Sequence, residues 1–282
     1  MPRKSSRTTC STRKNAVPYS SGQEKQEIAT GTLGKAISLL ELVVMSPEPL
    51  RFTDILHRSD QPRGTLHRQL SHLVEEGLLE QRGDQTYVAG IRLLKFAAKA
   101  WSGSDLRSIA APHLRALHEQ TGESVHLGVI RGTEIIYLDK IDGKHAVRMY
   151  SQIGRTSPLY CTGVGKAALS LLPEPELKTI IESLNFQSFT PSTIDTPERL
   201  LAEIETIRER GYGFDLEEHE TGIQCIAVPI SANRQDFRAA ISVTGPAYRL
   251  TREVLEGWAP LVKDIAREIS VDASLRLAPL GE

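Results

Sequence analysis

The sequence has few cysteines and no long apolar segment. Only three of its 282 residues are cysteine, and no two lie close together, which excludes a disulfide framework and is typical of a reducing compartment. No apolar run approaches the ~20 residues that a membrane span requires. The basic, Ser/Thr-rich residues 1–22 lack the apolar stretch of a secretory signal. We therefore expect a cytoplasmic protein that does not use the membrane as a partner.

The length and the charge distribution indicate two unequal domains. A chain of 282 residues exceeds the roughly 250 residues at which a single core stops growing. Residues 1–100 contain 15 Lys and Arg against 10 Asp and Glu, whereas the remaining residues contain 19 against 25. A basic end on an acidic body predicts that a polyanionic partner contacts the N-terminal third.

The N-terminal third has the pattern of a winged helix-turn-helix domain, which we place at residues 29–90 after a disordered basic arm at 1–28. Leu33, Ile37, Leu40 and Val44 form one apolar stripe of a first helix, which ends before Ser46. A short second helix ends at the turn 59–62. The third helix begins near Arg63 after Pro62, ends at Gly77 and buries Leu66, Leu70, Leu73 and Val74. Two strands at 78–81 and 86–88 form the wing.

The third helix is the predicted recognition helix, which enters the major groove of double-stranded operator DNA. Gly64 allows a close approach to the duplex, and the outer face presents Arg63, Thr65, His67, Arg68, Ser71 and His72. Arg63 or Arg68 has the donor geometry to bind guanine, and Arg82 at the wing tip is placed to reach the minor groove or a phosphate. Each residue taken singly is equally well explained as a solvated side chain.

The rest of the chain predicts a linker helix at 91–104 and a larger domain at 105–274, followed by a tail at 275–282. The patterns are mixed, which favours an α+β sensor layout without internal repeats. After the linker helix, helices are expected at 106–120, 165–172, 174–184, 197–210 and 251–270. Strands are expected at 124–130, 134–141, 147–153, 225–230 and 239–244.

Several stretches resemble the isocitrate-lyase-regulator (IclR) family of bacterial transcription factors. They include GKAISLLELV, PRGTLHRQLSHLVEEGLLEQ, GRTSPLYCTGVGKAALS and ERGYGFDLEEHETGIQCIAVPI. The resemblance implies a winged helix-turn-helix, a linker helix used in dimerisation and a C-terminal GAF-like α/β domain, assembled as a homodimer or a dimer of dimers. It also implies no catalysis and no cofactor. VRMYSQIGRTSPLYCTGVGKA looks similar to the branch that regulates sugar-acid catabolism, including the use of 2-keto-3-deoxygluconate.

The resemblance also implies an effector site for a small organic acid. The pocket loop of the family matches Cys161, Thr162, Gly163 and Val164. Its acidic position matches Asp215, its cysteine matches Cys225, and the polar positions of its last strand match Ser242 and Thr244. Arg148 is a further candidate for the pocket wall. A carboxylate is suited to the backbone N–H groups of the helix that opens near Gly163. Cys225 is also explained as a small buried core residue.

The sequence also offers three alternatives to an effector-controlled regulator. A thiol redox enzyme would use Cys161, whose pKa a Gly-rich helix start lowers, but no second cysteine lies nearby in the sequence. A metal site in residues 215–220 has carboxylates and an imidazole, but their spacing matches no defined ligand set, so we expect a solvated acidic loop and no metal. An architectural DNA-binding protein would leave more than half of the chain without a role.

Overall fold

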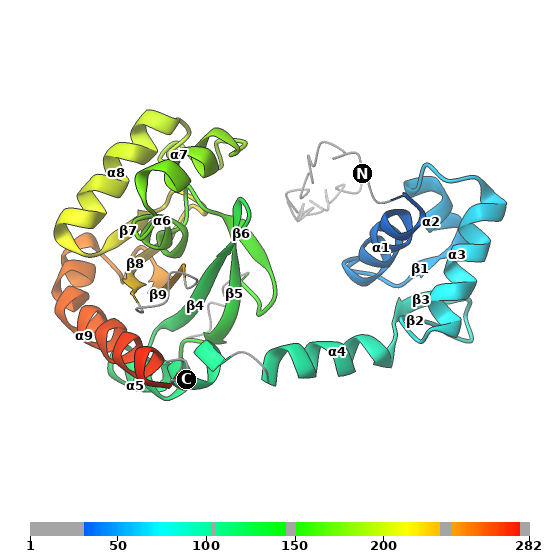
Figure 1. Cartoon of the computed structure of the whole chain (residues 1–282), viewed down its shortest axis with the longest axis horizontal. Helices are drawn as coiled ribbons and strands as arrows, with labels where there is room; N and C mark the ends of the chain where they lie inside the picture. Colours follow the sequence, from blue (N-terminus) through cyan, green and yellow to red (C-terminus); the bar gives the residue numbers. More distant parts are fainter. Residues whose placement is uncertain (1–30, 103–104, 145–150, 232–237, 277–282) are drawn as a thin grey trace, which may run out of the picture. The chain divides into compact units, whose positions relative to one another are not determined.

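The computed structural model describes residues 31–102, 105–144, 151–231 and 238–276, and the chain divides into two compact units (Figure 1). We call Met1–Ala97 the N-terminal unit and Ala98–Glu282 the C-terminal unit. The predicted arm 1–28 and Cys10 lie outside the described residues. Among the described helices, none is long and apolar enough to cross a membrane.

The N-terminal unit is a three-helix domain with a small antiparallel sheet. Its elements are α1 (Gly31–Val44), β1 (Leu50–Arg51), α2 (Phe52–Arg58), α3 (Arg63–Glu75), β2 (Leu79–Gln81) and β3 (Thr86–Ala89). The strand order is β1-β3-β2, so the predicted hairpin gains a third strand that the sequence pattern did not predict. Ile55, Leu66 and Leu70 lie in one buried cluster that joins the helices to this sheet. The helix-turn-helix prediction is confirmed.

The apolar stripe predicted for α1 is not the buried face of that helix. Leu33 is 69% exposed, and Ile37 and Val44 are also exposed. Leu40 is the one member of the predicted stripe that is buried, and Leu39 and Val43 are buried with it. Apolar residues occur on two sides of α1, so spacing alone selected the wrong side.

A close backbone contact joins the end of α3 to the end of the wing. Gly77 ends the helix with a φ of 67°, and a Cβ atom on Gly90 would lie 2.2 Å from the carbonyl oxygen of Gly77. The backbone N–H of Gly90 donates to the carbonyl of Leu78 at 2.9 Å. Glycine is therefore required at position 90, because any side chain would separate these two segments.

The linker helix α4 (Ile91–Ser102) leads into the C-terminal unit, whose centre is a six-stranded antiparallel sheet. The sheet has the order β6-β5-β4-β9-β8-β7. Its strands are β4 (Ser124–Arg131), β5 (Glu134–Ile141), β6 (Thr156–Pro158), β7 (Gly213–Leu216), β8 (Ile223–Ile230) and β9 (Ala239–Pro246). Its helices are α5 (Asp105–Thr121), α6 (Gly163–Leu169), α7 (Glu174–Glu182), α8 (Pro197–Arg210) and α9 (Arg252–Arg276).

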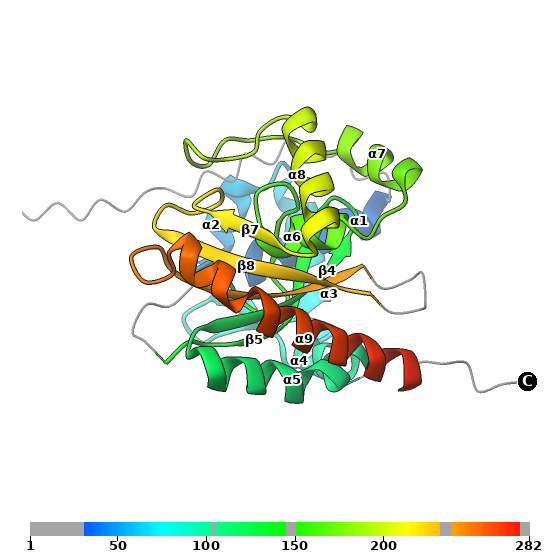
Figure 2. The same ribbon diagram turned by 90° about the vertical axis from the view of Figure 1, so that its left-hand side faces the viewer.

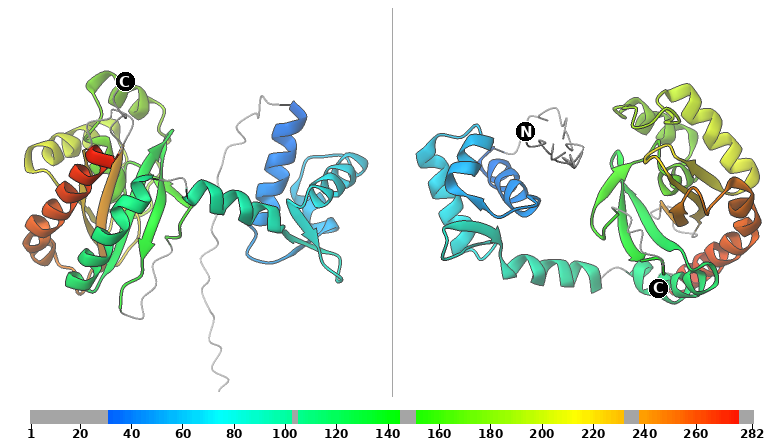
Figure 3. Two further views of the ribbon diagram at one scale, coloured as in Figure 1. Left: turned by 60° about the horizontal axis from the view of Figure 1, so that its bottom comes forward. Right: turned by 180° about the vertical axis from the view of Figure 1, so that it is seen from behind.

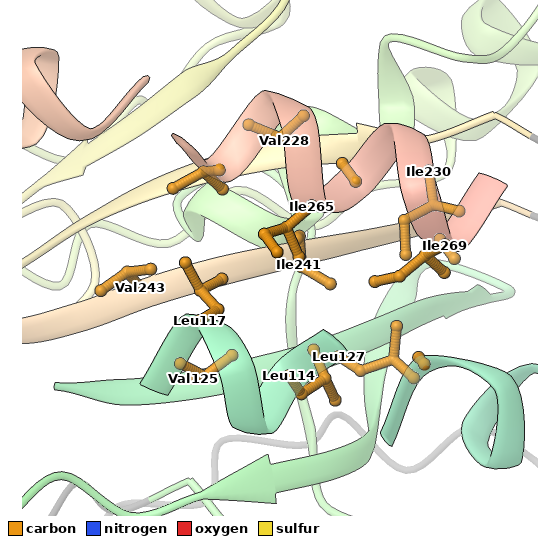
Figure 4. Close-up of a cluster of buried hydrophobic side chains, with 14 of the residues drawn as sticks. Leu114, Leu117, Val125, Leu127, Val228, Ile230, Ile241, Val243, Ile265 and Ile269 are labelled. Atoms are coloured by element: carbon orange, nitrogen blue, oxygen red, sulfur yellow. The ribbon is translucent and has the colours of Figure 1, made fainter. Parts of the chain in front are cut away.

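The two faces of this sheet carry different helices. Helices α5 and α9 lie side by side on one face, whereas α6, α7 and α8 lie on the other (Figures 2 and 3). Figure 4 shows the first layer, in which Leu114 and Leu117 of α5 and Ile265 and Ile269 of α9 pack on the inward side chains of the sheet. The second face contains the smaller and more polar side chains, as described below.

In the C-terminal unit one strand prediction needs correction and one strand was missed. The predicted strand 147–153 falls partly on residues outside the described ranges, and residues 151–153 are not in a strand. The strand that follows β5 is β6, which begins at Thr156. Strand β7 was not predicted at all, although it carries Asp215. The other predicted helices and strands occur with ends shifted by up to three residues, except that α9 extends six residues beyond its predicted end at 270.

Candidate DNA-binding surface and effector site

The outward face of α3 carries the side chains predicted for DNA recognition. Arg63, Gly64, His67 and Arg68 are exposed, while Thr65 and Ser71 are half-buried. On the opposite side, Leu66, Leu70 and Leu73 are buried as predicted, and Gln69 joins them. The position where Gly64 would carry a Cβ atom has no neighbouring atom within 4 Å, so the packing of the unit itself does not require glycine there.

Two of these residues pack around one aromatic ring. The guanidinium carbon of Arg63 lies 5.5 Å from the centroid of the Phe52 ring, and the His67 ring lies 6.1 Å from the same ring. Phe52 opens α2, so it fixes the start of α3 against the preceding helix. Arg63 and His67 are therefore held at one edge of the outward face, whereas Arg68 lies nearer to its centre.

The wing turn is ordered by its own polar groups. The side chain of Asp84 accepts hydrogen bonds from the backbone N–H of Thr86 at 3.1 Å and from its hydroxyl at 2.7 Å. These bonds lower the pKa of the Asp84 carboxyl. Gln85 takes the left-handed conformation with a φ of 64°. Arg82 is exposed at the start of this turn.

In the C-terminal unit, strand pairing places four of the predicted effector residues on one face of the sheet. Asp215 of β7 pairs with Cys225 of β8, and Cys225 pairs with Thr244 of β9. Ser242, two residues before Thr244, projects to the same face. Asp215, Cys225 and Ser242 are buried. Three strands far apart in the sequence therefore supply adjacent polar side chains.

Helix α6 covers this row at very short range. A Cβ atom on Gly163 would lie 2.4 Å from Sγ of Cys225 and 3.6 Å from the backbone nitrogen of Asp215. Cys161 and Val164 are buried beside it in the cluster under α6. The hydroxyl of Thr162 caps the helix, because it accepts a hydrogen bond from the N–H of Gly165 at 3.2 Å. The predicted pocket loop thus lies directly over the predicted strand residues, whereas Arg148 lies outside the described residues.

Burial gives this site unusual acid-base properties. Burial, reinforced by the nearby carboxylate of Glu218, raises the pKa of Asp215 to about 7. Oδ1 of Asp215 accepts a hydrogen bond from the backbone N–H of Glu218 at 2.7 Å. A carboxyl group with this pKa changes its protonation near neutral pH, so it either donates a hydrogen bond or repels an anion, depending on pH.

A buried ion pair next to Asp215 was not predicted. Lys166 of α6 is fully buried, and its ammonium group donates to Glu218 Oε2 at 2.6 Å. The hydroxyl of Thr193 donates to the backbone carbonyl of Glu218 at 2.7 Å. The sequence did contain an indication, because Lys166 is the only polar residue in the seven-residue helix GVGKAAL, and a helix that is apolar all round is buried.

A second polar cluster was also not predicted. His126 of β4 pairs with Ser242 of β9, so it lies one strand beyond the predicted effector residues on the same face. Its ring is buried and contacts Ser151, Ser242 and Thr244. Ser124, His126 and Gly128 are the small or polar residues that alternate with Val125, Leu127 and Val129, and this alternation is the pattern that marks the face.

The thiol redox alternative conflicts with the environment of Cys161. Burial raises the pKa of the Cys161 thiol, and Asp215 raises it further, so the thiolate that such chemistry needs is disfavoured. Burial likewise raises the pKa of Cys225. Both thiols are free. The expected lowering of the pKa at the helix start does not occur, because desolvation is the larger effect.

The groups of the loop 215–220 are bound to neighbours within the protein. Glu217 accepts a hydrogen bond from the N–H of Gly222 at 2.7 Å, and Glu218 pairs with Lys166. The ring of His219 lies 5.0 Å from that of Phe189. Within the described ranges, no group of three or more His, Cys, Asp or Glu side chains is arranged to hold a metal ion.

A surface hollow of the C-terminal unit lies away from this site. It encloses about 650 Å³ beside the β4–β5 turn, α7 and Arg238. None of the predicted effector residues lines it. At the predicted site α6 lies close to the sheet, because a Cβ atom on Gly163 would lie 2.4 Å from Sγ of Cys225.

Comparisons with known proteins agree with this architecture. The models of the IclR helix-turn-helix domain and of the bacterial transcriptional regulator IclR C-terminal domain match residues 32–83 and 98–271. The chain is 33% identical over 248 residues to the HTH-type transcriptional regulator KdgR of Escherichia coli K12, covering 88% of this chain and 94% of that protein. It is 34% identical over 248 residues to the HTH-type transcriptional repressor AllR of the same strain, covering 88% and 92%.

A solved structure extends the agreement to both units. The crystal structure of the Thermotoga maritima IclR is 34% identical, covers 86% of this chain and 98% of that one, and superposes with a TM-score of 0.71. The α+β fold class, with a winged helix-turn-helix, a linker helix and a GAF-like C-terminal domain, is confirmed by these findings and by the topology above.

Proposed function

Because the chain belongs to the IclR family of bacterial transcriptional regulators, we propose that it represses a catabolic operon under the control of a small carboxylate effector. The effector is a sugar acid or a keto acid. The observation that carries the proposal is the presence, in one chain, of an exposed basic recognition helix and of a buried polar row in a separate unit. The protein acts in the cytoplasm without catalysis and without a cofactor.

The recognition helix supports binding to double-stranded operator DNA. Arg68 and Ser71 lie on the face of α3 that is directed away from the core, and Gly64 opens that face without a side chain. An arginine binds O6 and N7 of guanine with two hydrogen bonds. Arg63, Thr65 and His67 flank this surface, and Arg82 extends it along the wing to a phosphate or the minor groove.

The polar row supports an effector site for an organic acid. In this proposal the carboxylate of the effector lies at Gly163 and Val164, where the first N–H groups of α6 have no partners within the helix. Cys161 and Thr162 form the adjoining wall. Ser242 and Thr244 bind hydroxyl or keto oxygens, and Asp215 and Cys225 contact the same end of the ligand.

The proposed assembly is a homodimer that associates further into a dimer of dimers. Ile91 and Leu94 lie one turn apart on α4 and are exposed, and Phe96 is exposed on another side of the helix, so α4 offers apolar surface to a second copy of the chain. The functional boundaries are those derived from the sequence: an arm at 1–28, the DNA-binding domain at 29–90, the linker at 91–104, the effector domain at 105–274 and a tail at 275–282. Two recognition helices then bind a palindromic operator.

Effector binding acts by shifting the balance between assemblies with high and low affinity for DNA. The shift equals the difference in ligand affinity between the two states, typically ~1–3 kcal/mol of coupling. A ligand at about one hundred times its Kd stabilises the protein by ~2.7 kcal/mol, which a thermal-shift measurement detects.

The test has two parts that use the same full-length protein. Selection from random duplex DNA yields the operator, and a thermal-shift panel of sugar acids and keto acids yields the effector. Substituting Ser242→Ala is expected to abolish the ligand-dependent change in operator affinity and to leave operator affinity without ligand unchanged. Loss of both properties together in a folded variant contradicts the division of roles between the two units.

A further inference from the structure

His126 is surrounded by hydroxyl groups in the interior of the C-terminal unit. Nε2 of the ring lies 2.8 Å from the hydroxyl oxygen of Ser151. Nδ1 lies 3.3 Å from the hydroxyls of both Ser242 and Thr244, which are 3.2 Å from each other. His126 and Ser242 are only 3% and 2% exposed, whereas Ser151 and Thr244 are partly buried.

The position of His126 makes it an extension of the proposed effector site. The register aligns Gly213, Ala227, Ser242 and His126 in one row across β7, β8, β9 and β4. The neighbouring row contains Asp215, Cys225 and Thr244. Because Ser242 and Thr244 contact Nδ1 directly, an effector group that binds these two hydroxyls also meets the imidazole.

The imidazole is uncharged and fixed in orientation. Burial, together with the nearby Lys140, lowers the pKa of His126 to about 3, so it does not act as a cation for a carboxylate. The ring packs on Tyr137 with centroids 5.2 Å apart. The Nε2 contact with Ser151 has the usual length of a good hydrogen bond, and it holds Nδ1 toward β9.

The chemistry at Nδ1 favours one kind of effector group. Its two contacts at 3.3 Å are longer than the roughly 2.8–3.0 Å of a well-formed hydrogen bond, so Nδ1 is shared by two partners and satisfied fully by neither. A hydroxyl group both donates and accepts, so it pairs with Nδ1 in either tautomer of the ring. Carboxylate and keto oxygens only accept, and an alkyl chain offers nothing.

We propose that His126 is a specificity-determining residue of the effector site, which selects acids that carry a hydroxyl group on the chain over acids of the same length without one. The inference rests on the proposed effector site and deepens it, because it assigns recognition of the hydroxyl to a residue outside the set carried over from the family. A ligand chain without a hydroxyl group leaves Nδ1 and the buried hydroxyl of Ser242 poorly paired, which weakens its binding.

The experiment compares two six-carbon 2-keto acids by calorimetry on the full-length protein. One is 2-keto-3-deoxygluconate, which carries hydroxyls, and the other is 2-oxohexanoate, which carries none. The wild-type protein is expected to bind the hydroxylated acid at least ~10-fold more tightly, as expected when a buried polar group loses its partner. The ratio of the two affinities is the readout, because general damage to the site weakens both ligands.

Two variants test the roles of the two ring nitrogens of His126 separately. The amide of His126→Asn ends near the position of Nδ1, whereas the amide of His126→Gln ends near Nε2. We expect H126N to keep most of the preference and H126Q to bring the two affinities within about threefold of each other. If H126Q does not fold, nitrogen NMR of the labelled wild-type imidazole replaces it, with a change at Nδ1 expected for the hydroxylated acid only.

The possible outcomes separate the role of His126 from the proposed class of effector. An unchanged affinity ratio in folded H126Q, or an Nδ1 resonance that responds equally to both acids, overturns the role of His126 and leaves the proposed effector class intact. Failure of the wild-type protein to bind either acid overturns the sugar-acid or keto-acid effector and the role of His126 with it.

Discussion

The ammonium group of Lys166 lies 2.6 Å from Oε2 of Glu218, and both side chains are enclosed between α6 and the loop after β7. Lys166 has no solvent exposure. The pair also determines the charge next to Asp215, since Glu218 raises and Lys166 lowers the pKa of that carboxyl. One buried cation is therefore shared by two buried carboxyl groups at the proposed effector site.

Removing the cation of this pair is expected to destabilise the C-terminal unit. Lys166→Met leaves Glu218 buried without a counter-charge, which typically costs about 3–5 kcal/mol. The free energy of unfolding, measured by urea denaturation at pH 7.5, is the test. The double variant with Glu218→Gln is expected to recover part of the loss. A single variant within ~1 kcal/mol of the wild type argues against a buried charged pair.

Asp215 is expected to make stability depend on pH in a defined direction. Burial raises its pKa from the ordinary 3.8 to about 7, so the folded state favours the protonated form. The free energy of unfolding therefore falls as pH rises from 3.8 through 7, and the full penalty is present above 7. Asp215→Asn keeps the acceptor for the N–H of Glu218 and removes the titration. We expect its advantage over the wild type to grow between pH 5 and pH 8 in thermal denaturation.

Arginine substitutions on the wing and on α3 are expected to affect DNA binding in different ways. Arg82→Ala at the wing removes a phosphate contact and lowers the slope of log affinity against log salt by about 1, for all sequences alike. Arg68→Ala weakens binding by about 1–3 kcal/mol and relaxes the preference at one base position. Operator titrations at several salt concentrations check both, with the exposed Arg115 of α5 mutated to Ala as the control.

The glycine contact in the N-terminal unit predicts a strong local effect. Gly90→Ala places a methyl group 2.2 Å from the carbonyl oxygen of Gly77, so the wing has to move away from α3. We expect a loss of about 1–3 kcal/mol or more in the free energy of unfolding of this unit. Gly83→Ala is the matched control, because its Cβ atom meets no atom within 4 Å. Equal stability of the two variants contradicts the close contact.

The sequence predicted most accurately those elements whose ends contain capping residues, proline or glycine. Helix α8 was predicted at residues 197–210 and occurs there, because Thr196 caps it, Pro197 opens it and Gly211 ends it with a φ of 80°. Strand β1 was missed because its two residues are too few to show periodicity. The buried side of α1 was assigned wrongly because only tertiary contacts decide between two apolar sides.

The candidate site was predictable only where the family resemblance named its residues. The register of β7, β8 and β9 then placed Asp215, Cys225 and Thr244 side by side. His126 precedes its partner Ser242 by 116 positions, and no local pattern encodes that pairing. The ion pair of Lys166 was missed for a similar reason, since its partner Glu218 lies far away in the sequence, in the loop after β7.

The glycine contact between α6 and β8 has a consequence for the rate at which an effector binds. Gly163 rests on Cys225 with no side chain between the helix backbone and the sheet, so the width of the gap is fixed by backbone atoms. Side chains change rotamer within picoseconds to nanoseconds, whereas shifts of packed segments take microseconds to milliseconds. We therefore expect entry of the effector to require displacement of the main chain, so that association is slow and reaches a maximum rate set by the protein as ligand concentration increases.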